Sequence, residues 1–238
     1  MQKNIPPFAA LVETAVPPSG KSIGNAKSRA GCLDSAALRR EIRSRMRPRG
    51  LLAYSNKGRA SGGVIPGVLG HIAVYLGTEA ELRRVGVWND PRIQPHQTAI
   101  CAGANFTSAD QKGVYLSFAA NALVTDRVVV MRPQDADPAR RAEAVGGCAQ
   151  RVGGWFDFHF DNAKPIKIYR SERIAQVMRE RDMPKLDMPE RRMCGRMTTL
   201  PDDIVAHSAV RRSKPDLVAY VRRTPVGWEV AGRQDLIF

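Results

Sequence analysis

Short β-branched and aromatic segments, separated by stretches with helical periodicity, constrain the fold of this chain most strongly. The clearest is 71–77, His-Ile-Ala-Val-Tyr-Leu-Gly, whose composition is typical of a strand. Residues 127–132 contain four consecutive apolar residues, Val128–Met131, which predict a strand in the middle of a sheet. Further strands are expected at 50–54, 114–117, 216–220 and 227–231.

Helices are expected between these strands. Residues 34–46 carry apolar residues at i, i+4 and i+8, with Asp34 or Ser35 as the N-terminal cap. Residues 138–152 have one apolar face and end at a Gly-Gly pair. Shorter helices are expected at 79–85, at 171–181 and from 200 onward; 94–104 fits a helix or a loop, and 183–197 is basic and irregular. The order predicts an α+β fold with a mainly antiparallel β-sheet and packed helices.

Composition divides the chain into two parts. Residues 1–33 are rich in Pro, Gly and Ser and have no sustained period, which predicts a mobile tail. Residues 34–238 are expected to form a single domain, since 43% hydrophobic and 25% charged residues are typical of globular proteins. No apolar run approaches the roughly 18 residues of a membrane span. No signal peptide is evident, so the default expectation is a cytoplasmic location, with export open if the start is mis-set.

The chain is strongly basic, with 37 Lys and Arg against 23 Asp and Glu and a formal net charge of +14. A basic chain can bind nucleic acid or anionic lipid, or it can simply have an Arg-rich, solvated surface. The second interpretation is favoured, because the basic clusters are not interleaved with aromatic residues and contain no nucleic-acid-binding motif. It allows weak, non-specific binding of anions or nucleic acid. The clusters lie at 39–49, 132–151, 179–196 and 211–223.

Cysteines and histidines give no sign of a metal site. The cysteines form no CxxC pair and have no regular spacing, which predicts isolated thiols. The histidines are scattered without metal-ligand spacing, so neither a metal nor another cofactor is expected. These residues are Cys32, Cys101, Cys148, Cys194, His71, His96, His159 and His207.

Three segments carry residues suited to chemistry. His71 begins an apolar strand, where its ring can reach a cleft at the edge of a sheet. Residues 155–161, Trp-Phe-Asp-Phe-His-Phe-Asp, alternate aromatic and polar side chains and place His159 among them. Residues 169–173, Tyr-Arg-Ser-Glu-Arg, open a predicted helix, a setting that suits a nucleophile.

In this order, the three segments resemble the circularly permuted papain-like amidases. These are relatives of the NlpC-type cell-wall cysteine peptidases in which the histidine precedes the cysteine. Residues 71–77 resemble the family's H-x-A-x-Y-L-G strand, 155–161 its Y-D-F-x-F-D segment and 169–173 its Y-C-S-E-L segment. Leu-Pro-Asp-Asp-Ile at 200–204 resembles its P-D-D-I segment, and 38–54 its leading helix and strand. The resemblance covers about residues 36–231 and implies a permuted papain-like domain.

The resemblance implies an acyl-transfer site in which His71 is the general base for a cysteine nucleophile. Substrates of this class contain amide or ester acyl bonds, as in cell-wall peptides or acyl lipids. This sequence has Arg170 at the position of the cysteine. A helix start and a nearby imidazole favour a thiolate, whereas a guanidinium stays protonated and cannot attack a carbonyl. The neighbouring Ser171 is rotated by about 100° on a helix and is not expected to replace the nucleophile.

The family also implies a third polar residue, often Glu, that orients the imidazole. Its best counterpart is Ser108, with Asp110 as the alternative; serine can hydrogen-bond but supplies no charge. Two functions follow: a degenerate cysteine hydrolase for an unknown peptide or acyl substrate, or a basic binding module on the same scaffold. The expected binding residues are Tyr169, Ser171, Glu172 and His159.

Overall fold

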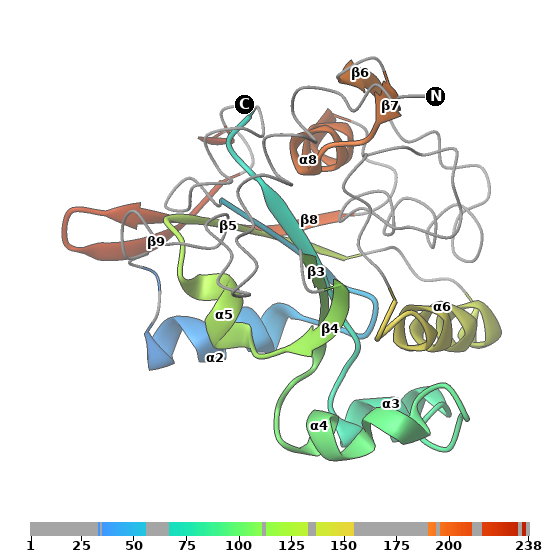
Figure 1. The fold of residues 1–238 in the computed structure, drawn as a ribbon. Helices are drawn as coiled ribbons and strands as arrows, with labels where there is room; N and C mark the ends of the chain where they lie inside the picture. Colours follow the sequence, from blue (N-terminus) through green and yellow to red (C-terminus); the bar gives the residue numbers. More distant parts are fainter. Residues whose placement is uncertain are drawn as a thin grey trace, which may run out of the picture.

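A seven-stranded open sheet organises the chain in the computed structural model, which describes residues 33, 35–55, 67–110, 113–132, 137–154, 190–193, 196–210, 216–232 and 235–236. The strand order is β4-β3-β2-β1-β5-β8-β9, and every pairing is antiparallel. The expected combination of helices with a mainly antiparallel sheet is therefore confirmed (Figure 1). The strands are β1 (Leu51–Tyr54), β2 (His71–Tyr75), β3 (Phe106–Asp110), β4 (Gly113–Ser117), β5 (Arg127–Arg132), β8 (Asp216–Thr224) and β9 (Gly227–Ala231).

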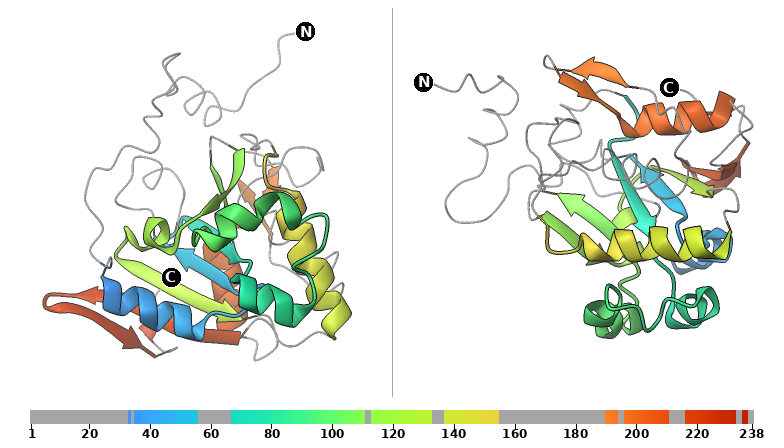
Figure 2. Two further views of the ribbon diagram at one scale, coloured as in Figure 1. Left: turned by 90° about the horizontal axis from the view of Figure 1, so that it is seen from below. Right: turned by 90° about the vertical axis from the view of Figure 1, so that its right-hand side faces the viewer.

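Helices cover both faces of the sheet (Figure 2). On one face lie α2 (Ala36–Arg45) and α5 (Ala119–Leu123). The core on the other face receives residues from α3 (Glu79–Val85), α4 (Gln97–Cys101), α6 (Pro138–Gln150) and α8 (Pro201–Val210). A short 3-10 helix, η3 (Gln94–His96), precedes α4, and a hairpin of β6 (Arg191–Met193) and β7 (Arg196–Thr198) precedes α8.

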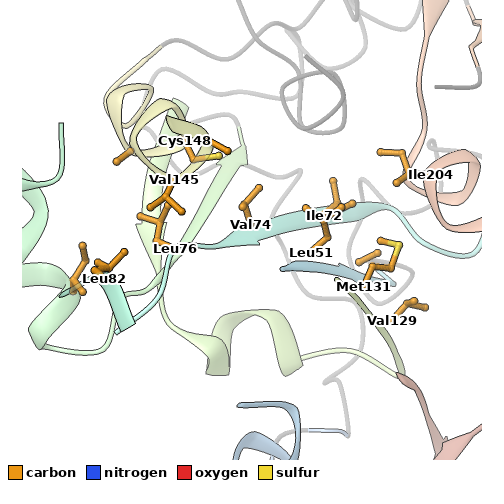
Figure 3. Packing of buried hydrophobic residues seen from close by; sticks show 14 of the residues in the cluster. Leu51, Ile72, Val74, Leu76, Leu82, Val129, Met131, Val145, Cys148 and Ile204 are labelled. Atoms are coloured by element: carbon orange, nitrogen blue, oxygen red, sulfur yellow. The ribbon is translucent and has the colours of Figure 1, made fainter. Parts of the chain in front are cut away.

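Two hydrophobic cores lie on the two faces of the sheet, because side chains alternate along each strand. In β1, Leu51 and Ala53 belong to one core, whereas Leu52 and Tyr54 belong to the other. Figure 3 shows part of the first core, with Ile204 of α8 at one end of the labelled side chains. The central strands β1 and β5 are buried on both sides, which explains why the run Val128–Met131 is continuously apolar.

Local capping explains where the helices begin. The backbone N–H of Leu38 donates to Ser35 Oγ at 3.1 Å, so Ser35 caps α2. Thr78 and Glu81 form a capping box at the start of α3. Pro201 occupies the first position of α8, where the absence of an N–H costs no hydrogen bond.

The described structure also corrects and extends the predictions. Residues 183–197 were expected to be irregular, but their described part contains β6 and most of β7, whose three-residue strands are too short to show a period. Residues 94–101 are helical, α8 is longer than the short helix predicted to begin near residue 200, and β8 continues beyond the predicted strand 216–220. The segments 1–32, 155–161 and 171–181 lie outside the described residues.

Candidate functional site

His71 begins β2 and is buried, with 3% of its surface exposed. Its strand pairs with β1 so that His71 lies opposite Tyr54, and the two ring centroids are 4.6 Å apart. The backbone N–H of Gly70 donates to the carbonyl of Tyr54 at 3.2 Å, which extends the pairing by one residue. The imidazole is therefore held by two neighbouring strands of the sheet.

Asp202 of α8 holds the segment that leads into His71. Its two carboxylate oxygens accept hydrogen bonds from the backbone N–H groups of Val68, at 2.6 Å, and Leu69, at 2.7 Å. Gly67 precedes them with a φ of +94°, and a Cβ there would lie 1.8 Å from Asp202 Oδ2. The resemblance to a P-D-D-I segment pointed to these residues, but their contact with the strand of His71 was not predicted.

Ser108, to which the resemblance assigns the third polar position, lies beside His71. His71 Nε2 is 2.6 Å from Ser108 Oγ, and the serine is also buried, with 4% of its surface exposed. The two residues are 37 positions apart in sequence and come together because β3 pairs with β2. The contact shows the geometry expected of an orienting residue, whereas its role in catalysis stays a prediction.

Tyr115 lies in one cluster of polar side chains with Asp110, Ser108 and His71, and the sequence did not predict its place there. Its hydroxyl donates to Asp110 Oδ2 at 2.9 Å, and in the β3–β4 register it lies directly opposite Ser108. Burial raises the pKa of Tyr115 most. The charge of Asp110 and the hydrogen bond from Tyr115 to Asp110 raise this pKa further, whereas Ser108 lowers it. The signal was available, since the predicted strand 114–117 closely follows the segment containing Ser108 and Asp110.

The cluster can hold an imidazole in one orientation, but its described residues include no thiol. Cys101 is exposed next to Glu79, and Cys148 is buried in the core that Figure 3 shows, on the other face of the sheet. Neither cysteine belongs to the group around His71. A nucleophile for acyl transfer would have to come from elsewhere in the chain.

The remaining predicted site residues lie outside the described residues: His159, Tyr169, Arg170, Ser171 and Glu172. Of the other histidines, His96 has its Nε2 at 3.2 Å from the carbonyl of Ala149, and His207 lies on α8. Within the described ranges, no group of three or more His, Cys, Asp or Glu side chains could hold a metal ion.

None of the helices in the described part of the chain has the length and apolar character needed to cross a membrane. Comparison with protein-family models, with curated proteins and with solved structures finds no match for this chain. The resemblance to permuted papain-like amidases therefore rests on the sequence segments.

Proposed function

We propose that this protein is a degenerate member of the permuted papain-like hydrolases, which binds a peptide or acyl ligand without cleaving it. The buried hydrogen-bonding contact between His71 and Ser108 supports this proposal most directly. Two residues singled out for a general base and its orienting partner are in contact across neighbouring strands.

The missing element of the proposed site is the nucleophile. A papain-like reaction needs a thiolate to attack the acyl carbonyl and an imidazolium to protonate the leaving group. In this chain the imidazole is present and Arg170 occupies the position that the resemblance assigns to the thiol. An arginine at that position can instead pair with a carboxylate or another anionic group of a ligand.

The basic binding module receives less support. In the cluster 39–49, Arg43 forms an ion pair with Glu81 and Arg45 one with Glu41. Part of this cluster is therefore neutralised within the protein rather than presented to an anionic partner.

The test restores the thiol with Arg170→Cys and measures its rate of alkylation by iodoacetamide near neutral pH. Ser171→Cys is the matched control, because it places the same thiol one residue further along the predicted helix. The hydrogen bond to Glu79 raises the pKa of Cys101 and so lowers its thiolate fraction, and the alkylation of the native protein, which has Arg170, is subtracted as the background of its own cysteines. The proposal expects the thiol at 170 to react at least about tenfold faster than the thiol at 171.

A second comparison ties this reactivity to the histidine. The rate at position 170 should fall toward the control rate when His71→Ala is added. The native protein should bind peptide or acyl esters without hydrolysing them. Equal rates at 170 and 171, together with no effect of His71→Ala, would show that position 170 does not face the imidazole, and the proposal would be wrong.

A further inference from the structure

We infer that Asp202 of α8 is a positioning residue for His71: its carboxylate binds the backbone that leads into β2 and so keeps the imidazole against Ser108. Asp202 acts on the site through the chain and does not itself touch a ligand. The inference deepens the proposed function, on which its relevance to a hydrolase-like site rests.

The anchored segment is close to the imidazole along the chain. The backbone N–H groups of Val68 and Leu69 both donate to Asp202. The N–H of the next residue, Gly70, donates to a carbonyl of β1. Leu69 is only two residues before His71, so at most about 7 Å of extended chain separates their two Cα atoms. A displacement of the anchored segment is therefore transmitted to His71.

The sheet supports the start of β2 mainly from one side. β1 pairs with β2 along residues 71–74, whereas the backbone pairing of β2 with β3 in the described part of the chain covers residues 74–75, at the far end. At His71 the contact with β3 is made by side chains, over the 2.6 Å to Ser108. This contact depends on the position of the start of β2, to which Asp202 provides a second attachment.

Two buried acidic residues in the first turn of α8 have different described contacts. Asp203 Oδ2 accepts from the backbone N–H of Leu200 at 3.0 Å, a contact within the start of its own helix. Asp202 instead binds two successive N–H groups of a distant segment, an arrangement that suits an anion and offsets the cost of burying a carboxylate. These contacts assign the helix start to Asp203 and the strand start to Asp202.

The fold keeps Asp202 on the opposite side of the sheet from the imidazole. His71 lies opposite Tyr54 in the β1–β2 register, so its ring is on the face whose core includes Tyr54. α8 packs through Ile204 on the core of the other face. Asp202 therefore influences the imidazole through the position of the backbone, and its removal should let the ring leave Ser108.

The experiment measures how often His71 becomes accessible in the full-length protein. Diethyl pyrocarbonate acylates neutral imidazoles that reach the solvent, and mass spectrometry locates the label among the four histidines of the chain. Because His71 is buried, it should be labelled slowly in the native protein. In Asp202→Ala its labelling rate should rise by roughly tenfold or more, since hydrogen bonds to a charged group are lost and the start of β2 opens more often.

Asp203→Ala is the matched control, because it removes a similarly buried carboxylate from the same helical turn. It should leave the labelling rate of His71 at its native value. His207, on α8 itself, should keep its native rate in Asp202→Ala. An unchanged rate at His71 in Asp202→Ala would overturn the inference. An equal rise in Asp203→Ala, or a parallel rise at His207, would overturn it as well, by showing that the whole of α8 loosens.

A second pair keeps the test valid if the alanine variants do not fold. Asp202→Asn and Asp203→Asn provide the same comparison with a smaller rise, because an amide keeps one acceptor oxygen and replaces the other by a donor.

A second readout links the position of the imidazole to its chemistry. In an Arg170→Cys protein, Asp202→Ala should lower the alkylation rate at position 170 toward the value found with His71→Ala, whereas Asp203→Ala should not. If Arg170→Cys shows no acceleration at all, the proposed function fails, and the labelling of His71 still decides the role of Asp202. Either proposal can therefore fail alone.

Discussion

A buried tyrosine that donates to a carboxylate lies near each end of β2, but the two pairs have different further partners. At one end, Tyr75 donates its hydroxyl to Glu81 Oε2 at 2.5 Å. At the other end, near His71, Tyr115 donates to Asp110 at 2.9 Å. In both pairs burial contributes most to raising the pKa of the phenol, and the hydrogen bond to the carboxylate raises it further.

The difference lies in the other partners of each pair. Glu81 also binds the guanidinium of Arg43, at 2.8 Å, and caps α3 through Thr78, and Arg43 lies over the ring of Tyr75. Every group at this end therefore ties one secondary-structure element to another. At the opposite end Tyr115 lies opposite Ser108 in the β3–β4 register, and Ser108 Oγ is 2.6 Å from His71 Nε2. A buried tyrosine–carboxylate pair is therefore not by itself a sign of function. The second pair is of interest because a buried histidine lies next to it.

The first prediction compares the glycines that flank β2. Gly67→Ala should destabilise the protein by about 3–5 kcal/mol, because it combines a positive φ with the loss of the hydrogen bonds to Asp202. A Cβ at Gly67 would lie 1.8 Å from Asp202 Oδ2, so the carboxylate must move away from Val68 and Leu69. The measurement is the free energy of unfolding in urea.

Gly77→Ala is the matched control at the other end of the strand. Gly77 also has a positive φ, +125°, but the atoms nearest to its Cβ would be side-chain carbons of Pro48 and Leu82, at 3.2 Å or more. We expect a loss of about 1–2 kcal/mol, set mainly by the backbone strain. An equal loss for the two variants would mean that Asp202 contributes nothing to the His71 end of β2.

Much of the fold could be predicted from local sequence. The β-branched composition of residues 71–77 and the apolar run in 127–132 identified two strands of the sheet, and the periodicity of residues 34–46 identified α2. These signals are local, since alternation, capping residues and glycines act within a few positions of one another. Residues 119–123 were not predicted to be helical, because a five-residue helix is too short to show a period.

The candidate site depends on contacts that no local pattern contains. Ser108 was identified through the resemblance, but its link to Tyr115 depends on the register of β3 and β4. The contact of Asp202 with Val68 joins residues 134 positions apart and needs the tertiary arrangement of α8. Sequence analysis could therefore propose the members of the site but not the hydrogen bonds that connect them.

The second prediction uses the pH dependence of stability to test whether the contacts around Tyr75 and Glu81 stabilise the fold. Burial tends to raise the pKa of Glu81, but hydrogen bonds from Thr78, Tyr75 and Arg43 outweigh it and hold the pKa below its ordinary value of 4.5. A carboxyl whose pKa is lower in the folded state stabilises the protein above pH 4.5, and that stability is lost as the pH falls through the lower, folded value. Glu81→Gln should remove this part of the acid dependence.

At neutral pH, Glu81→Gln should cost about 1–2 kcal/mol, through weaker hydrogen bonds to Arg43 and Tyr75. The measurement is the free energy of unfolding across a pH series below neutrality. Glu79→Gln is the control, since Glu79 lies on the same helix but is more exposed and should have a smaller effect. A Glu81→Gln protein with the acid dependence of the native chain would show that the Tyr75 end does not stabilise the fold as described.

The third prediction concerns the hydroxyl of Thr107, the residue next to Ser108 on β3. Thr107 precedes Ser108 on β3 and therefore points to the opposite face of the sheet. Its Oγ1 is buried and has no hydrogen-bond partner among the residues that the structure describes. Its neighbours in the register are Val74 and Leu116, so the hydroxyl lies among apolar side chains.

Thr107→Val keeps the shape of the side chain and removes the buried polar atom, so we expect a gain of about 0.5–1 kcal/mol in stability. Since this face is opposite the one on which Ser108 contacts His71, that contact should not change. Ser108→Ala, one residue later, removes a hydroxyl that has a partner and should instead destabilise the protein. Destabilisation by more than about 1 kcal/mol would contradict the prediction, because a hydroxyl without a partner has no hydrogen bond to lose.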